Sequence, residues 1–249
     1  MICLGPSPQP QLLMSRLKGK VVVVTGASRG IGLAIAQVLG RERASLILIG
    51  RDRQALRRAA GELPGDALPL VADVTRPAQV SRAFTVIRRR HRHIDVLVNS
   101  AGVFTYKPFA RTTLREWREN IEANLTSLFL TTRAALPLLE RSRAAHLVNI
   151  LSICSREAFP NCAAYSASKF GALGLTRVLR EELRSRGIRV TAILPGSTDT
   201  RLIKAFGFPV DRSKLLQPCD VAEAVLGALL QPPRAAVEEI VLLPAAGRL

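Results

Sequence analysis

Residues 21–32, Val-Val-Val-Val-Thr-Gly-Ala-Ser-Arg-Gly-Ile-Gly, constrain the fold more than any other stretch of the chain. Four consecutive β-branched valines favour a strand buried on both faces, as in a parallel sheet covered by helices. Gly26, Gly30 and Gly32 then predict a tight turn, and residues 33–39 resume with the apolar spacing of a helix. A strand, a glycine turn and a helix N-terminus together present free backbone N–H groups to a phosphate. The spacing differs from the standard Gly-x-Gly-x-x-Gly fingerprint, so an ordinary strand-to-helix turn stays an alternative for this stretch alone.

The rest of the chain alternates short apolar runs with helical segments. Further strands are predicted at residues 46–49, 68–71, 94–98, 146–150, 190–194 and 240–243. Helices are predicted at residues 30–40, 52–61, 76–91, 113–140, 163–186 and 219–230. Strict alternation predicts right-handed βαβ units, and therefore an α/β fold whose doubly wound parallel sheet of about seven strands carries helices on both faces. We expect a single domain over residues 17–249 after a flexible extension over residues 1–16, with Met14 as an alternative start.

Composition narrows the class of protein. No window holds the ~18 consecutive apolar residues that cross a membrane, and residues 1–13 lack the pattern of a secretory signal. No membrane segment is expected. The four cysteines, Cys3, Cys154, Cys162 and Cys219, show neither C-x-x-C nor metal-ligand spacing. The sequence therefore predicts no metal site and favours a reducing cytoplasm.

The net charge of +17 raises the alternative of a nucleic-acid partner. The basic residues are nearly all arginines, scattered along the predicted helices rather than gathered in one segment. Their densest run, residues 88–92, ends a predicted helix, where cations favour the helix dipole. Aromatic residues that could stack on bases make up only 4% of the chain. Nucleic-acid binding is therefore not expected, whereas an acidic partner or an anionic substrate stays open.

Polar or glycine residues follow each of the first six predicted strands, at the edge where a parallel sheet binds its ligands. The second strand ends at Arg51, where an NAD-binding protein would usually place an acidic residue for the ribose 2′-hydroxyl. Arg51 and Arg29 would instead attract a 2′-phosphate, so together they favour NADP over NAD. Asp73 follows the third strand, although an Asp in that place is as often a helix N-cap.

Four residues predict acid–base chemistry beside this nucleotide site. Tyr165 and Lys169 stand at i and i+4 of a predicted helix and share one face. An ammonium close to a phenol stabilises the phenolate, so we expect the pKa of Tyr165 to fall from ~10 toward neutrality. Ser152, after the fifth strand, could polarise a substrate carbonyl, and Asn124 inside the long helix could hold a water that links the lysine to solvent. Together they describe hydride transfer to a carbonyl.

These motifs, in this order, resemble those of the short-chain dehydrogenases/reductases over nearly the whole chain from about Leu17. The matching residues are Thr25-Gly-Ala-Ser-Arg-Gly-Ile-Gly32, Asp73-Val74, Asn99-Ser-Ala-Gly102, Asn124, Ser152, Tyr165-x-x-x-Lys169, Pro195-Gly196 and Thr200. The resemblance implies a Rossmann fold that binds NADP(H). It also implies a catalytic tetrad of Asn124, Ser152, Tyr165 and Lys169.

The resemblance further implies how the cofactor is held. Lys169 would touch the nicotinamide ribose, Asp73 and Val74 would flank the adenine, and residues 195–200 would cover the nicotinamide end. The residues expected to bind the cofactor are Gly26, Ser28, Arg29, Gly30, Ile31, Gly32, Arg51, Asp73, Val74, Asn99, Ala101, Gly102, Tyr165, Lys169, Pro195, Gly196, Thr198 and Thr200.

The chain departs from the family pattern at several positions. Ser100 replaces the second Asn of Asn-Asn-Ala-Gly, which could loosen a hydrogen bond to the central strand, and Leu151 replaces a common Ser. The tail, residues 244–249, lacks the Gly-Gly typical of 3-oxoacyl-[acyl-carrier-protein] reductases. The short segment over residues 200–218 predicts a small substrate lid and an open site.

We therefore expect an NADPH-dependent reductase that converts a ketone or aldehyde to an alcohol, with Tyr165 as the proton donor. The nearest branch is the 3-oxoacyl-[acyl-carrier-protein] reductases, because Arg143 and Arg186 match basic positions that contact the acidic carrier there. Chance matches among so many arginines are the alternative. Phe206 and Phe208, with Ile203, favour an apolar substrate portion or simple lid packing.

Two further expectations concern partners and role. Family members are usually homotetramers or homodimers built on the two long helices, which correspond to residues 113–140 and 163–186. The alternative function is a non-catalytic NADP-binding or nucleic-acid-associated protein that has kept the fold. The intact tetrad argues against it, and the high positive charge is the feature in its favour.

Overall fold

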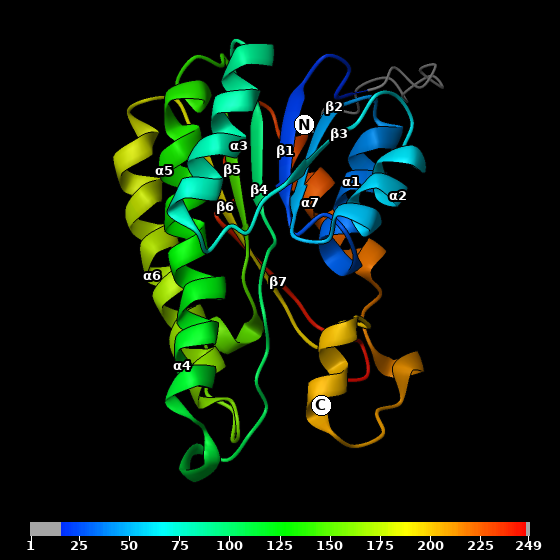
Figure 1. Cartoon of the computed structure of the whole chain (residues 1–249), viewed down its shortest axis with the longest axis vertical. Coiled ribbons are helices and arrows are strands. Elements are labelled where there is room, and N and C mark those ends of the chain that lie inside the picture. Colours follow the sequence, from blue (N-terminus) through cyan, green and yellow to red (C-terminus); the bar gives the residue numbers. More distant parts are fainter. Residues whose placement is uncertain (1–15, 248–249) are drawn as a thin grey trace, which may run out of the picture.

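Seven parallel strands form one sheet in the order β3-β2-β1-β4-β5-β6-β7 in the computed structural model, which describes residues 16–247 (Figure 1). The strands are β1 (Val21–Thr25), β2 (Ser45–Gly50), β3 (Leu68–Val71), β4 (Val96–Asn99), β5 (His146–Ile150), β6 (Arg189–Pro195) and β7 (Glu239–Leu242). The helices are α1 (Gly30–Arg41), α2 (Arg53–Gly61), α3 (Pro77–Arg90), α4 (Leu114–Ile121), α5 (Ser127–Leu139), α6 (Ala163–Arg184) and α7 (Pro218–Leu229). The predicted doubly wound α/β fold is confirmed. The extension expected over residues 1–16 lies, apart from Arg16, outside the described residues.

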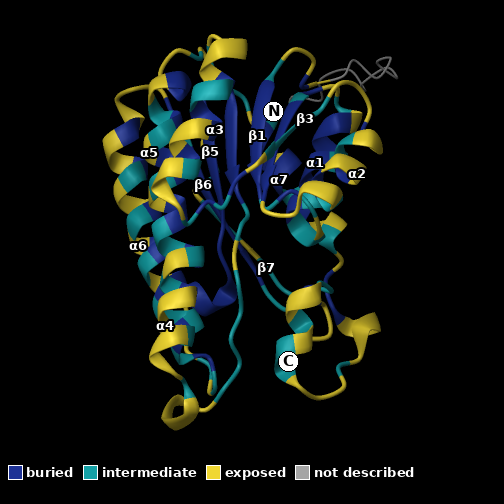
Figure 2. Cartoon of the chain, in the orientation of Figure 1, coloured by how far each residue is buried: buried dark blue, intermediate teal, exposed yellow. Residues whose placement is uncertain are grey.

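The valines of β1 serve two separate cores, one on each face of the sheet. Val22 and Val24 pack into the core beneath α1, α2 and α7. Val21 and Val23 pack into the core beneath α3, α5 and α6. All four are buried, and the central strands form the buried middle layer in Figure 2. Side chains alternate across a strand, so only a strand with apolar residues at every position can satisfy both layers of helices.

The long helix predicted over residues 113–140 is not continuous. It is divided into α4 and α5 by a π-helical turn over Glu122–Thr126. Thr113 caps α4 by accepting a hydrogen bond from the Glu116 N–H, and the Glu116 side chain accepts one from the Thr113 N–H. The π turn inserts an extra residue and rotates the following face of the helix, as such turns often do at functional sites. Asn124 lies within it.

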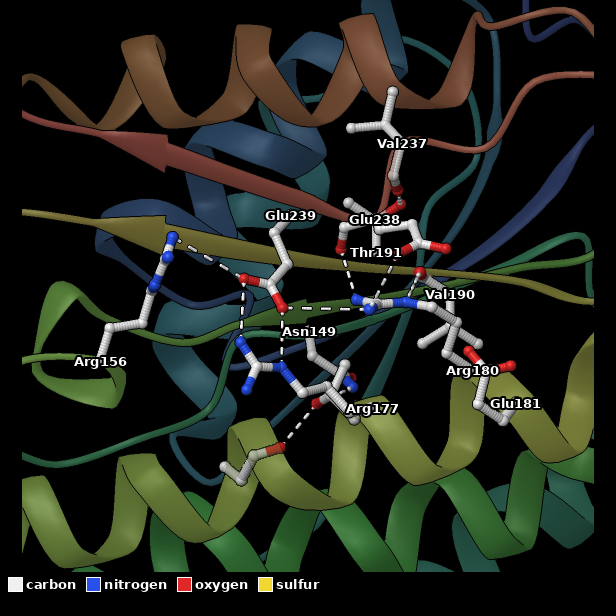
Figure 3. A network of polar contacts seen from close by, with 12 residues as sticks. Asn149, Arg156, Arg177, Arg180, Glu181, Val190, Thr191, Val237, Glu238 and Glu239 are labelled. Carbon is white, nitrogen blue, oxygen red and sulfur yellow. Dashed lines mark hydrogen bonds and ion pairs between the residues drawn. The ribbon is translucent and has the colours of Figure 1, made fainter.

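Part of the large positive charge fastens the edge strand β7 to α6 (Figure 3). Arg177 donates from Nε to Glu239 Oε1 at 2.9 Å, and Arg156 Nη1 lies 3.9 Å from the other carboxylate oxygen. Arg180, which is buried, donates from Nη2 to the Glu238 carbonyl oxygen at 2.7 Å. Arg177 and Arg180 thus link helix α6 to the start of strand β7, and Arg156 adds a contact from the turn after β5. This is a structural use of charge that needs no external partner.

None of the helices in residues 16–247 combines the length and the apolar character needed to span a membrane.

Candidate active site

The carboxyl ends of the strands open into one cavity of about 650 Å³. The chain passes from β1 to β2 on one side of the sheet, whereas β4 continues on the other side of β1. Open α/β sheets bind ligands at this reversal of strand order, because the connecting segments diverge there and leave a crevice. The site is therefore placed by the topology before any side chain is considered.

The turn after β1 is built for close approach of backbone and ligand. Gly26 has a φ of +68°, and a Cβ at this position would lie 2.9 Å from the Cα of Ala101. Helix α1 begins at Gly30, and the side chain of its N-cap residue, Arg29, forms no capping hydrogen bond. The first turn carries no acidic residue either. Its N–H groups and the positive end of the helix dipole therefore face the cavity, where they suit a phosphate.

Two exposed arginines flank this end of the cavity. Arg29 and Arg51 both line it, and neither has a carboxylate partner among the ion pairs of the described residues. The adjacent Asp52 is engaged as the N-cap of α2: it accepts a hydrogen bond from the Ala55 N–H at 3.0 Å, which lowers the pKa of its carboxyl. The arginines are thus available for an additional phosphate.

Asp73 and Val74 line the same part of the cavity. The Asp73 carboxylate accepts hydrogen bonds from the N–H and the hydroxyl of Thr75, at 3.0 and 2.8 Å. The alternative that Asp73 caps the next helix is wrong, because the N-cap of α3 is Arg76. The carboxylate instead shapes the turn that follows β3.

The other end of the cavity holds Ser152, Tyr165 and Lys169. Tyr165 and Lys169 stand one turn apart near the start of α6, as their spacing predicts. Lys169 Nζ lies 5.7 Å from the centroid of the Tyr165 ring and donates to the Ile150 carbonyl oxygen at 3.1 Å. Ser152 follows β5, and its hydroxyl is hydrogen-bonded to the phenol of Tyr165. An acid, a cation and a polar hydroxyl thus converge on one place.

Burial, rather than attraction to Lys169, dominates the titration of Tyr165. It raises the pKa of the phenol above its ordinary value, with the hydrogen bond from Ser152 acting in the opposite direction. Burial also lowers the pKa of the Lys169 ammonium to about 8. The expectation that the pKa of Tyr165 falls toward neutrality is therefore wrong for the protein without its cofactor. Desolvation disfavours both the phenolate form of Tyr165 and the ammonium form of Lys169.

Asn124 is buried and uses its whole side chain as a clamp. Its Oδ1 accepts from the Val103 N–H at 2.9 Å, and its Nδ2 donates to the Val103 carbonyl at 3.1 Å and to Ser168 Oγ at 2.9 Å. Gly102 permits this contact, since a Cβ there would lie 2.7 Å from Asn124 Oδ1. Asn124 therefore ties the segment after β4 to the helix that carries Tyr165.

The structure brings all the predicted site residues except Asn99 to the cavity wall. Asn99 is buried below it, donating to Thr132 and Asn149 and accepting from Thr131 at 2.7 Å. Ser100, which replaces the second Asn of the family pattern, still forms a hydrogen bond to the central strand: its backbone N–H donates to Thr25 Oγ1 at 3.1 Å.

Two groups of cavity residues gave little or no sequence signal. Cys154 and Cys162 line the cavity with their thiols hydrogen-bonded to each other, an interaction that lowers the pKa of Cys154 and raises that of Cys162. Only their closeness to Ser152 and Tyr165 in the chain pointed to them.

Phe104 packs against Tyr165, and Tyr106 packs against Phe206 of the lid. They belong to a segment without helix or strand periodicity, so no pattern marked them.

Comparison with known proteins decides the family. The model of the short chain dehydrogenase family matches residues 20–207. The chain belongs to this family. An uncharacterized oxidoreductase of Staphylococcus aureus (strain USA300) is 38% identical over 232 residues, which cover 93% of this chain and all of that protein. An uncharacterized oxidoreductase of Staphylococcus epidermidis is 34% identical over 231 residues, which cover 93% of this chain and all of that protein.

Solved structures of short-chain dehydrogenases superpose over almost the whole chain. A metagenomic short-chain oxidoreductase in complex with NADP has a TM-score of 0.81 at 33% identity, covering 92% of this chain and 99% of that one. The alcohol dehydrogenase of the archaeon Thermococcus sibiricus, complexed with 5-hydroxy-NADP, has a TM-score of 0.85 at 30% identity, covering 92% and 98%. The seven-stranded architecture described above is that of the family.

Proposed function

We propose that this short-chain dehydrogenase reduces a ketone or aldehyde to an alcohol with NADPH as the reductant. One observation carries the proposal: Ser152, Tyr165 and Lys169 converge at one end of a cavity whose other end offers an open helix N-terminus and two arginines that form no ion pair within residues 16–247. NADP-bound relatives of the same fold support the choice of cofactor. The cysteine usage supports a cytoplasmic setting as part of this proposal.

The residues present fit NADP(H) along the length of the cavity. The first turn of α1 would hold the diphosphate, and Arg29 and Arg51 would hold the 2′-phosphate that distinguishes NADP from NAD. Asp73 and Val74 would flank the adenine, and Lys169 would bind the nicotinamide ribose. The remaining predicted cofactor residues that line the cavity are Gly26, Ser28, Gly30, Ile31, Gly32, Ala101, Gly102, Tyr165, Pro195, Gly196, Thr198 and Thr200.

The chain's own residues supply the proton chemistry. NADPH, when bound, supplies the hydride. Ser152 donates a hydrogen bond to the substrate carbonyl and orients it. The Tyr165 hydroxyl would give a proton to the carbonyl oxygen as negative charge develops on it. Lys169, protonated at neutral pH, stabilises the phenolate that remains. Asn124 binds both Val103 and Ser168, and so it holds the helix that carries Tyr165 against the segment after β4.

Replacing Tyr165 with Phe tests this role directly. Loss of the proton donor is expected to lower kcat about 10²- to 10⁴-fold, the usual worth of general acid catalysis, while NADPH binding measured by fluorescence is retained. Tyr106→Phe is the matched control, because Tyr106 also lines the cavity but its hydroxyl lies outside the tetrad. An unchanged kcat in Tyr165→Phe would overturn the assignment.

A 3-oxoacyl thioester on an acyl-carrier protein is the second candidate substrate. The observation that favours it is that Arg143 and Arg186 are both exposed. Arg143 precedes β5 and Arg186 precedes β6, so both lie at the amino-terminal edge of the sheet, opposite the cavity. Arg186 also donates a hydrogen bond to the Glu140 carboxylate at 2.6 Å. A carrier protein bound at this edge would be separated from the catalytic residues of the same chain by about the length of one strand, ~17 Å. NADPH oxidation with acetoacetyl thioesters, compared with simple ketones, separates the two.

The non-catalytic alternative makes a different prediction. A protein that only binds NADP or nucleic acid would show tight cofactor binding or salt-dependent DNA affinity without turnover of any carbonyl. Turnover of a carbonyl with NADPH would exclude it as the main role.

We further propose a homodimer or homotetramer that buries the outer face of the helices α4 to α6. Phe129, Phe170 and Val178 are 43–52% exposed on these helices, which is costly for an isolated chain. Light scattering after size exclusion should show a dimer or tetramer for the wild type and a smaller species for Phe170→Asp. A monomeric wild type would contradict this.

A further inference from the structure

Aromatic residues are scarce in this chain and concentrated at one place. The sequence has eleven, comprising eight Phe, two Tyr and one Trp. Six of them line the cavity of the site: Phe104, Tyr106, Phe159, Tyr165, Phe206 and Phe208. Phe208 is 55% exposed, so hydrophobic burial within the chain does not account for its position. Exposed apolar side chains that rim a cavity mark a surface for a ligand.

The rings form two facing walls that meet near Tyr165. Phe104 and Tyr106 come from the segment after β4, and Phe206 and Phe208 come from the lid that begins with the 3₁₀ helix Arg201–Phe206. Phe104 packs edge-on against Tyr165, with ring centroids 4.7 Å apart and an interplanar angle of 77°. Phe206 packs edge-on against Phe104 at 5.4 Å and against Tyr106 at 4.9 Å. A continuous aromatic lining thus leads from the lid to the proton donor.

The first wall is fixed on both sides of Phe104. Val103 is held by Asn124 through both its N–H and its carbonyl group. The hydroxyl of Thr105 accepts a hydrogen bond from Asn120 Nδ2 at 2.7 Å. Phe104 therefore presents its ring from an anchored backbone, which keeps a ligand ring from shifting relative to Tyr165.

The second wall belongs to the lid, outside the sheet and the α-helices. Gly207, with a φ of +73°, separates Phe206 from Phe208, and all three residues belong to a segment of short 3₁₀ turns. A ring that enters the cavity can take the place of the lid rings in their edge-to-face contacts with Phe104 and Tyr106, so the aromatic interactions are exchanged rather than lost.

We propose that the substrates of this site are neutral aryl ketones or aryl aldehydes, whose ring lies between these two walls with the carbonyl oxygen at Ser152 and Tyr165. This inference rests on the proposed carbonyl reduction. The hydride bonds to the carbonyl carbon, the C=O π electrons move to oxygen, and Tyr165 protonates it, so the aryl group is unchanged. An uncharged ring gains contacts among these side chains, whereas a charged group there would lose its hydration.

A matched set of methyl ketones tests the proposal in the full-length protein with saturating NADPH. Acetophenone, cyclohexyl methyl ketone and 2-butanone differ in the aromatic character and the size of the group beside the carbonyl. The variants are Phe206→Ala, the milder Phe206→Leu, and Phe109→Ala as the control, because Phe109 is 79% exposed and does not line the cavity. NADPH fluorescence verifies that each variant still binds cofactor.

We expect kcat/KM for acetophenone to exceed that for the cyclohexyl ketone, and to fall about 10-fold in Phe206→Ala. The value for 2-butanone should change less than about 2-fold, and Phe109→Ala should match the wild type. Reduction of all three ketones with equal kcat/KM, or an equal loss for all three in Phe206→Ala, would overturn the aryl assignment and leave carbonyl reduction standing. Failure to reduce any carbonyl compound while NADPH binds would overturn the proposed function and this inference with it.

Discussion

Replacing Lys169 with methionine is expected to stabilise the fold at pH 7 while abolishing turnover. Burial lowers the pKa of Lys169 from its ordinary 10.5 to about 8, so the folded protein holds this proton less tightly than the unfolded chain does. At 1.36 kcal/mol per pH unit, the difference corresponds to about 3 kcal/mol of lost stability at pH 7. Methionine keeps most of the apolar stem but leaves the Ile150 carbonyl without its donor, at a cost of about 1 kcal/mol. The net gain is about 2 kcal/mol, or ~4–8 °C in Tm for a chain of this length.

The stability advantage of Lys169→Met over the wild type should decrease as pH rises. Between pH 8 and 10.5 the unfolded chain binds the Lys169 proton and the folded protein does not, so the wild type becomes more stable as pH rises through this window. The advantage of Lys169→Met should therefore be constant below about pH 8 and almost vanish by pH 9.5. Urea unfolding at pH 7 and pH 9.5 measures it, with the exposed Lys18→Met as the control. A variant that is less stable than the wild type at pH 7, or whose difference from it is the same at both pH values, would refute burial as the cause.

Three other changes test the cofactor end, a buried imidazole and the β7 clamp. Arg51→Asp should reverse the preference for NADPH over NADH through repulsion of the 2′-phosphate; kcat/KM values that still favour NADPH would show that Arg51 does not contact it. Burial lowers the pKa of His146 to about 3, so the unfolded chain binds this proton below about pH 6.5 and the wild type should lose about 2 kcal/mol between pH 6.5 and 5. His146→Gln should flatten this slope in urea titrations, and an unchanged slope would assign it to other groups. Glu239→Gln should cost about 1–2 kcal/mol because it removes the partner of several arginines, whereas Glu119→Gln, in an exposed pair, should cost almost nothing. Equal losses would contradict the clamp.

The fold was predictable because its strongest signal is local. A run of four valines can satisfy two helix layers only in the middle of a parallel sheet, and the structure places Val22 and Val24 in one core and Val21 and Val23 in the other. The glycine turn, Ser152 and the Tyr165–Lys169 pair follow from position at strand ends and from helix spacing, so they were placed correctly as well. Each of these inferences needs only neighbours in the chain.

The parts that could not be predicted depend on contacts between distant segments. Asn124 binds Val103, 21 positions away, and the π turn that holds it there interrupts an otherwise regular helix pattern. The Asn99 side chain forms hydrogen bonds with Thr131 and Asn149 in a buried network. Its position at the end of a strand does not reveal whether the side chain faces this network or a ligand. The pKa of Tyr165 was predicted with the wrong sign because spacing reveals the nearby lysine but not the extent of burial.

The directions of the two active-site pKa values agree with a site that reduces rather than oxidises near neutral pH. Burial keeps the Tyr165 phenol protonated, which is the form that donates to a developing alkoxide. An alkoxide is a much stronger base than a phenolate, so the transfer stays favourable even though the pKa of the phenol is raised. Oxidation of an alcohol would require Tyr165 to begin as phenolate, the form that the same burial disfavours. With a pKa of about 8, Lys169 is still mostly charged at pH 7, and in the proposed mechanism it stabilises the phenolate only after the proton has left. The desolvation that costs the fold stability at Lys169 is therefore the same property that suits Tyr165 to its proposed role as the acid.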